Sequence, residues 1–204
     1  LRTLSGNDTS FLEIAVDTPV KIAADGGSVE PNIAKSWTVS ADGTGFIFQL
    51  REGMKWSDGE PFNADDFALS WEHLYLHPDF GTWNAPYLDP SGELATFTKI
   101  DDYTINWTFG MPNFNFLRGS WFVRWGGLGG YVGGNTYLPW HHMQQFHPTF
   151  TAKAELDAAV EAEGLERWDQ LFNQKKHWGN NPEVPVIGPF VGITDSRTAI
   201  WKIE

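Results

Sequence analysis

Apolar and polar residues alternate along much of residues 33–56, as they do in half-buried strands. Every second residue from Phe46 to Leu50 faces one side of an extended chain, and the residues between them face the other side. The stretch from Ser40 to Gly43 is expected to turn, because glycine readily adopts a positive φ. A second tight turn at residues 52–53 is expected to reverse the direction of the chain, so that Met54 to Trp56 form a returning segment. The pattern therefore predicts β-hairpins in this part of the chain.

A helix is expected to begin after Asn63, which is a good N-cap residue, and to end by about His77. Apolar residues recur three or four positions apart from Phe67 to Leu74, so they form one stripe along the helix. Pro78 cannot continue the helix and is expected to stop it.

The rest of the chain predicts more hairpins and helices. Residues 96–109 alternate as a second hairpin, and residues 152–175 form two helical segments separated by Gly164. Residues 179–192 are expected to form an exit loop, and residues 198–203 a strand. Strand pairs followed by helices predict an α+β fold, in which a small antiparallel sheet of hairpins packs with helices.

Composition narrows the possible functions. The 204 residues include 14 Lys and Arg against 26 Asp and Glu, which gives a net charge of −12. An acidic surface without a basic run repels nucleic acid, so no nucleic-acid partner is expected. The chain has no cysteine, and no apolar run reaches the length of about 18–20 residues that a membrane span needs. The chain lacks an initiator Met and stops within the expected final strand, so both ends are expected to be cut points in a longer polypeptide.

Three consecutive segments carry a family resemblance. Residues 30–37 read EPNIAKSW, residues 46–59 read FIFQLREGMKWSDG, and residues 61–67 read PFNADDF. They resemble, in register, the P-x-L-A-x-S-W, F-x-L-R-x-G-x-K-W-S-D-G and P-x-T-A-x-D-F motifs of the family 5 bacterial extracellular solute-binding proteins, which are the oligopeptide-, dipeptide- and nickel-binding proteins of ABC importers. Weaker similarities follow in the same order at residues 100–105, 138–141 and 185–190.

The resemblance implies part of a two-lobed fold of the periplasmic-binding-protein type II kind. Residues 1–29 would be a partial flanking segment, residues 30–185 the smaller subdomain of the first lobe, and residues 186–204 the truncated start of the neighbouring subdomain. It also implies a binding protein rather than an enzyme, with no cofactor. Such a protein captures an extracellular solute, here expected to be an oligopeptide, and delivers it to an ABC permease in the membrane. The expected location is periplasmic or extracellular, associated with the cell surface.

Candidate ligand-binding residues come from loops. By its position, the stretch from Trp83 to Tyr87 resembles the loop that places an aromatic side chain at the cleft edge in peptide-binding relatives. Tyr87 is the first candidate and Trp83 the second, with Asn84 between them. Trp121 and Trp125 lie in a later loop and are further candidates.

The other tryptophans divide by context. Trp37, Trp56, Trp71 and Trp107 lie on apolar faces and are expected in the core. Trp140 is expected in a loop, where it could contact a ligand.

Several motifs have a structural and a functional interpretation. Asp58 is interpreted as a turn residue, and Asp65 and Asp66 as residues of a helix N-terminus. This structural interpretation is preferred to one in which they are the paired catalytic acids of a glycosidase. His73 and His77 could hold a metal at their i, i+4 spacing, although no third ligand is evident and none is expected. The glycine-rich residues 126–134 form no phosphate loop and are interpreted as a surface loop or a flap near the cleft.

Three alternative functions stay open. The 11 Trp residues would suit a binding protein for oligosaccharide or another non-peptide solute. A glycoside hydrolase fragment is a remote alternative, because no catalytic residues or nucleophile motif stand out. An adhesion or interaction domain is the third.

Overall fold

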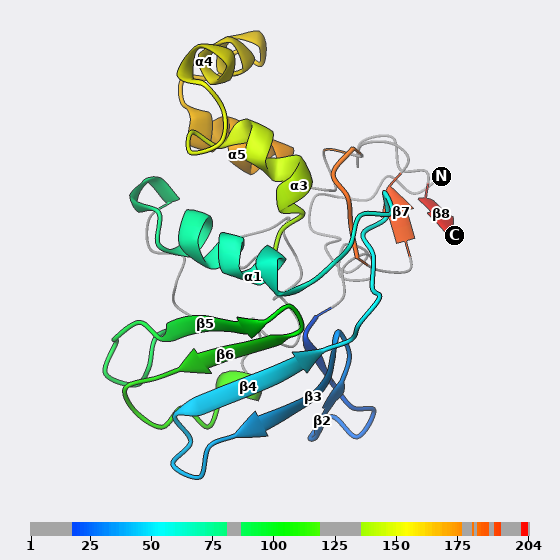
Figure 1. Cartoon of the computed structure of the whole chain (residues 1–204), viewed down its shortest axis with the longest axis vertical. Helices are drawn as coiled ribbons and strands as arrows, with labels where there is room; N and C mark the ends of the chain where they lie inside the picture. The colour runs from blue at the N-terminus through cyan, green and yellow to red at the C-terminus, as the bar shows by residue number, and fades with distance from the viewer. Residues whose placement is uncertain are drawn as a thin grey trace.

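The computed structural model places a twisted antiparallel sheet on one side of the helix that begins at Ala64 and the remaining α-helices on the other side (Figure 1). It describes residues 18–80, 87–118, 136–176, 181, 183–187, 190–192 and 201–203. The sheet consists of β3 (Ala34–Val39), β4 (Gly45–Leu50), β5 (Thr96–Asp101) and β6 (Thr104–Thr108), in the order β3-β4-β6-β5. Both predicted hairpins are therefore confirmed, and they join side by side through β4 and β6.

The register of the sheet separates an apolar face from a polar one. Phe46 pairs with Trp107 and Phe48 with Ile105 across β4 and β6, and all four side chains are buried. The residues that alternate with them on these two strands are exposed or half-buried. The predicted alternation is thus confirmed, and Gly43 in the first turn has a φ of 71°.

The helix after the sheet begins as predicted. In α1 (Ala64–Ser70), the Asn63 side chain accepts a hydrogen bond from the Asp65 backbone, and the Asp66 side chain reaches back to the Asn63 backbone. The helix continues as the π-helical turn η2 (Trp71–Tyr75), and η3 (Pro78–Phe80) follows as a 3₁₀ turn. Helix α1 packs beside β5 (Figure 1), where an ion pair of 2.7 Å joins Asp65 to Lys99.

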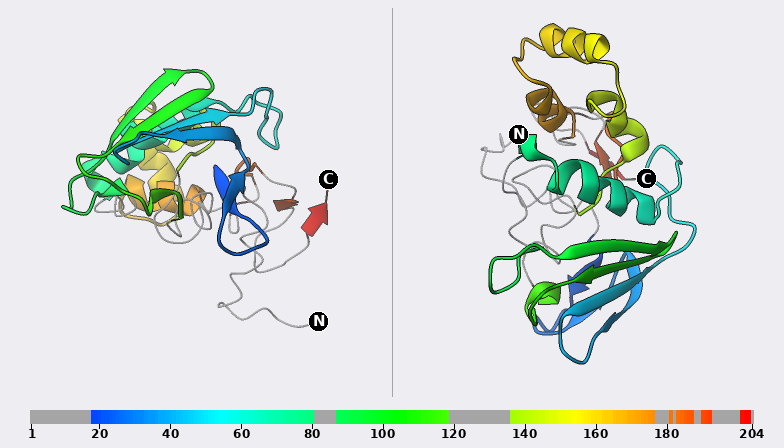
Figure 2. Two further views of the ribbon diagram at one scale, coloured as in Figure 1. Left: turned by 90° about the horizontal axis from the view of Figure 1, so that it is seen from below. Right: turned by 60° about the vertical axis from the view of Figure 1, so that its left-hand side comes forward.

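The remaining helices extend away from the sheet. They are α3 (Trp140–Met143), η6 (Gln144–Phe146), α4 (Lys153–Ala162) and α5 (Trp168–Lys175), and α4 lies farthest from the sheet (Figure 2). Gly164 separates α4 from α5 with a φ of 68°, as the sequence predicts. Leu156, Val160 and Leu171 form a small core of their own between these two helices.

Short elements complete the described residues, and the structure corrects the sequence interpretation at two places, residues 54–56 and residues 190–192. Strand β1 (Val20–Ile22) pairs with β2 (Val29–Pro31), β7 (Phe190–Gly192) pairs with β8 (Trp201–Ile203), and η5 (Phe116–Arg118) is a 3₁₀ turn. The segment from Met54 to Trp56 pairs with the residues that follow it, through an isolated antiparallel bridge between Lys55 and Pro61 across the turn at Gly59.

The prediction of an exit loop over residues 179–192 is wrong at its C-terminal end, because residues 190–192 form strand β7. The division at residues 29 and 185 stays a prediction. None of the helices in the described residues combines the length and apolar character required to cross a membrane.

Candidate functional site

Four of the five predicted ligand-binding residues lie outside the described residues. These are Trp83, Asn84, Trp121 and Trp125. The glycine-rich residues 126–134 lie outside them as well. Tyr87 is the one candidate among the described residues, and it directly follows residues 81–86, which lie outside them. The surroundings of Tyr87 therefore define the described part of the candidate site.

Tyr87 is enclosed rather than open at an edge. Its side chain is 2% exposed, and its ring stacks on Trp107 with centroids 5.7 Å apart. Trp71 and Tyr75 pack edge-on against it at 5.1 and 4.8 Å. The Tyr87 hydroxyl donates a hydrogen bond of 3.2 Å to the Thr136 hydroxyl. The structure thus gives Tyr87 a role in the core, and its contact with a solute stays a prediction.

The two tyrosines place neutral polar groups inside an aromatic core. Burial raises the pKa of Tyr87 to about 12 and raises the pKa of Tyr75 well above its usual value. Both phenols therefore stay protonated at physiological pH and act as hydrogen-bond groups, not as charges. The Tyr75 hydroxyl faces the Tyr87 hydroxyl, and the interaction between the two adds to the rise of the Tyr75 pKa.

The sequence signals for this cluster differ in strength. Tyr75 lies four positions after Trp71 on the predicted apolar stripe, so its place near Trp71 could have been anticipated. Thr136 is 49 residues from Tyr87 and has no local signal.

Trp140 corrects the sequence interpretation. It opens helix α3 instead of lying in a loop, and it is buried. Its indole donates a hydrogen bond of 2.8 Å to the Ser70 hydroxyl at the end of α1. Trp140 therefore joins the helices and is not available to a ligand. The predicted core tryptophans Trp56, Trp71 and Trp107 are buried, and Trp37 is half-buried against the same core.

His73 and His77 meet a third histidine, His147, which is fully buried. The His147 ring lies 5.2 Å from each of the other two rings, centroid to centroid. Its Nδ1 accepts a hydrogen bond from the Thr149 backbone, so the proton is on Nε2, which donates to the His73 carbonyl at 3.2 Å. Burial lowers the pKa of His147 to about 4, and the two neighbouring histidines add to this shift.

Both His147 nitrogens are thus engaged by the backbone and cannot ligate a metal. Within the described residues, no group of three His, Cys, Asp or Glu is placed to hold a metal ion.

The three carboxylates weighed as glycosidase acids have structural partners. Asp58 lies 2.8 Å from His141, and Asp65 pairs with Lys99. Asp66 is buried, and one of its oxygens caps Asn63 and accepts from the Trp56 indole at 3.3 Å. Burial raises the pKa of Asp66 to about 7, against the effect of these hydrogen bonds. The structural interpretation of these residues therefore agrees with their contacts.

The family profile of the bacterial extracellular solute-binding proteins, family 5, matches residues 28–191. The chain belongs to this family, whose members are binding proteins and not enzymes.

Similar proteins bind different solutes. The periplasmic alpha-galactoside-binding protein of Rhizobium meliloti strain 1021 is 44% identical over 89 residues, which is 44% of this chain and 13% of that protein. The nickel-binding periplasmic protein of Escherichia coli strain K12 is 56% identical over 193 residues, 91% of this chain and 33% of that protein.

A solved structure of the oligopeptide-binding protein OppA matches 95% of this chain and 29% of its own, with a TM-score of 0.78 and 30% identity. The predicted fold is therefore confirmed as that of family 5 binding proteins. The chain spans only 13 to 33% of the length of these similar proteins.

Proposed function

We propose that this chain is part of the solute-binding component of an ABC importer that captures an oligopeptide outside the cytoplasm. The observation that carries the proposal is the family match over residues 28–191, together with a fold like that of an oligopeptide-binding protein over 95% of the chain. The proposed partners are a small solute and the permease. The proposed location is periplasmic or extracellular, at the cell surface, where the proteins named as periplasmic among its relatives act.

The proposed mechanism is capture by closure of two lobes. Solute binds to one lobe of the open protein, and a hinge motion buries it against the other lobe. Peptide N–H and C=O groups must then find hydrogen bonds from protein or trapped water, because each unpaired buried group costs about 1–3 kcal/mol. Closure also creates the surface that the permease recognises.

The described residues support this mechanism with a rigid base. Tyr87, Tyr75 and Trp71 pack in a neutral aromatic cluster, and the Tyr87 ring stacks on Trp107 of the sheet, so Tyr87 is a fixed anchor. We propose that Trp83 and Asn84, just before this anchor, contact the solute. Trp121 and Trp125 are proposed to contact it from the segment that ends before Thr136.

An oligosaccharide is the second candidate solute. A relative named for binding alpha-galactosides is 44% identical over part of the chain, and aromatic rings suit the apolar faces of sugars. A nickel complex has less support, because His73, His77 and His147 are packed against one another and the backbone.

The test is a thermal-shift and calorimetric screen of the longer polypeptide that contains this chain. Di- to pentapeptides, alpha-galactosides and nickel with free histidine form its three arms. A micromolar constant for peptides alone would support the proposal, and one for alpha-galactosides alone would replace it with the second candidate. The 204-residue chain without an opposing lobe is expected to bind peptides weakly or not at all, so a micromolar constant for the chain itself would contradict capture by two lobes.

A further inference from the structure

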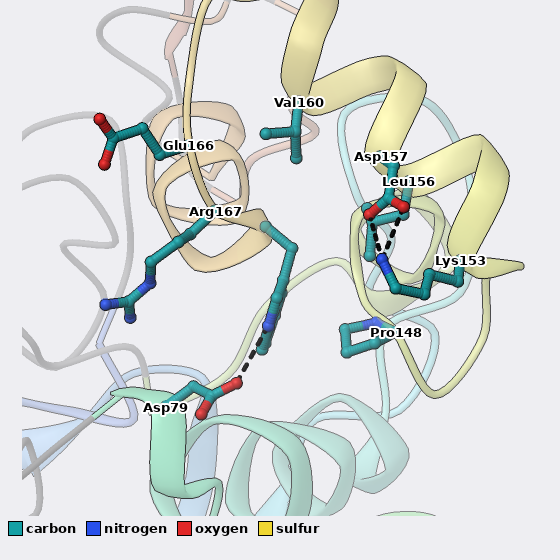
Figure 3. Close-up of a pocket in the computed structure, with 9 residues that line it drawn as sticks. Asp79, Pro148, Lys153, Leu156, Asp157, Val160, Glu166 and Arg167 are labelled. Atoms are coloured by element: carbon teal, nitrogen blue, oxygen red, sulfur yellow. Dashed lines mark hydrogen bonds and ion pairs between the residues drawn. The ribbon is translucent and has the colours of Figure 1, made fainter.

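A groove lies between α4, the start of α5 and η3 (Figure 3). Its volume is about 560 Å³, which is in the range of pockets that hold small molecules. A folded protein partner would need a much larger surface, so the size favours a small ligand. The lining residues are Asp79, Pro148, Lys153, Leu156, Asp157, Val160, Glu166, Arg167 and Trp168.

The groove has an apolar lining. Leu156 and Val160 of α4 belong to the small core between the helices, and Pro148 lies across from Val160 (Figure 3). Trp168 adds a half-buried indole ring, which packs edge-on against His77 and His147 at 5.1 and 4.9 Å. These contacts hold the ring in place, so it forms a preformed wall of the groove.

Both cations of the groove are already neutralised. Lys153 reaches the two oxygens of Asp157 at 2.8 and 2.6 Å. Arg167 binds Asp169 through Nε and one terminal nitrogen at 2.7 and 2.8 Å, in the two-pronged geometry typical of strong pairs. Each of these cations therefore already has a carboxylate partner.

Asp79 is the carboxylate left over at the groove. One of its oxygens accepts a hydrogen bond of 3.0 Å from the Trp168 indole. The pKa of Arg167, raised mainly by its hydrogen bonds to Asp169, is raised further by the Asp79 charge, but among the described residues Asp79 forms no ion pair within 4.0 Å. A carboxylate accepts about four hydrogen bonds, so Asp79 keeps acceptor capacity beside the ring. Glu166 also has no ion pair among these residues, but its side chain points away from Val160 (Figure 3).

A carboxylate, an indole and an alkyl surface next to one another match one ligand chemistry. A guanidinium or ammonium group can pair with Asp79 and interact with the indole of Trp168 through a cation–π contact. The alkyl chain that carries the cation can lie on Leu156 and Val160. We propose that this groove is a binding site for a small ligand with a guanidinium or ammonium group on an alkyl chain, of the size of arginine.

The probe for the test is Nα-acetyl-argininamide (argininamide below), whose only charge is the guanidinium. Nα-acetyl-citrullinamide (citrullinamide below) is its uncharged isostere and the matched control compound. Each is titrated into the isotopically labelled 204-residue chain at low salt, and the indole N–H resonance of Trp168 is followed by NMR. We expect argininamide to shift this resonance along a saturating curve with a millimolar constant and citrullinamide to bind at least about fivefold more weakly.

The variant Asp79→Asn separates the proposal from non-specific attraction. It keeps an oxygen that can accept from the Trp168 indole but removes the charge, and we expect it to weaken argininamide binding by about fivefold. Glu166→Gln removes one charge nearby, so it is the matched control and should change binding by less than about twofold. Thermal melting of each variant checks that the fold is kept.

Two results would overturn the proposal. One is the absence of a saturating Trp168 shift with argininamide, or an equal response to citrullinamide. The other is equal weakening by Asp79→Asn and Glu166→Gln, which would mean that the compound responds only to the overall negative charge. The solute screen described above does not depend on this groove, so the proposed function and the groove site fail separately.

Discussion

The four-stranded sheet and the α4–α5 helix pair bury their apolar residues on different scales. Phe48, Ile105 and Trp107 of the sheet belong to a continuous core that reaches α1 and α3. Apart from Phe172 of α5, which belongs to that continuous core, the helix pair has a core of three buried residues and three ion pairs on or near its surface. Surface ion pairs contribute little free energy, so the sheet side should hold the fold and the helix pair should respond first to change.

Phe48→Ala is expected to have the largest effect. Phe48 is fully buried and packs edge-on against Trp107 at 5.7 Å, so its removal should lower the free energy of unfolding by about 3–5 kcal/mol. Urea denaturation followed by far-UV circular dichroism gives this value. A loss below about 1 kcal/mol would mean that the sheet core is not the main source of stability.

Leu171→Ala tests the other side of the comparison. Leu171 is fully buried in the small core, and we expect a loss of about 2–4 kcal/mol that is felt mainly by α4 and α5. Hydrogen exchange should speed up for amides of these helices while β4 and β6 stay protected. Equal acceleration in the sheet would show that the two regions unfold as one unit.

One buried titratable group in each region changes the free energy of unfolding with pH, and the two changes have opposite signs. His147, beside the helix pair, has a folded pKa of about 4, below the ordinary 6.5, so the unfolded state binds more protons between these values and stability rises with pH. Asp66, beside the sheet, has a folded pKa of about 7, above the ordinary 3.8, so stability falls as pH rises through this range.

Urea midpoints between pH 4.5 and 6.5 measure the two opposing effects. Relative to the original chain, His147→Asn should make the slope of stability against pH more negative by up to about 1.4 kcal/mol per pH unit. Asp66→Asn should make it more positive by a similar amount. Unchanged slopes in both variants would contradict the assigned pKa directions.

Lys153→Ala is expected to have the smallest effect. The Lys153 side chain is 86% exposed, and its pair with Asp157 spans one helical turn, so the change in the free energy of unfolding should stay within about 0.5 kcal/mol. Thermal melting at low and high salt checks this. A larger, salt-sensitive loss would mean that ion pairs stabilise the helix pair more than its core does.

Local patterns predicted the elements whose formation depends on neighbouring residues. The β3–β4 hairpin follows from alternation and from Gly43, and the start of α1 follows from Asn63 and its capping partner Asp66. Trp140 was misplaced because the sequence around it is rich in loop residues, whereas the Ser70 hydroxyl that binds its indole lies 70 residues earlier.

The sequence by itself determined the family, through motifs in register from Glu30 to Phe67, and it determined which faces of the sheet and of the main helix are apolar. The tertiary structure alone decided that Tyr87 is enclosed, that His147 meets His73 and His77, and that Asp79 holds the Trp168 indole. The physical reason is range: propensity, capping and periodicity act within about one to three turns of chain, whereas burial and the pairing of polar groups depend on which distant segments pack together.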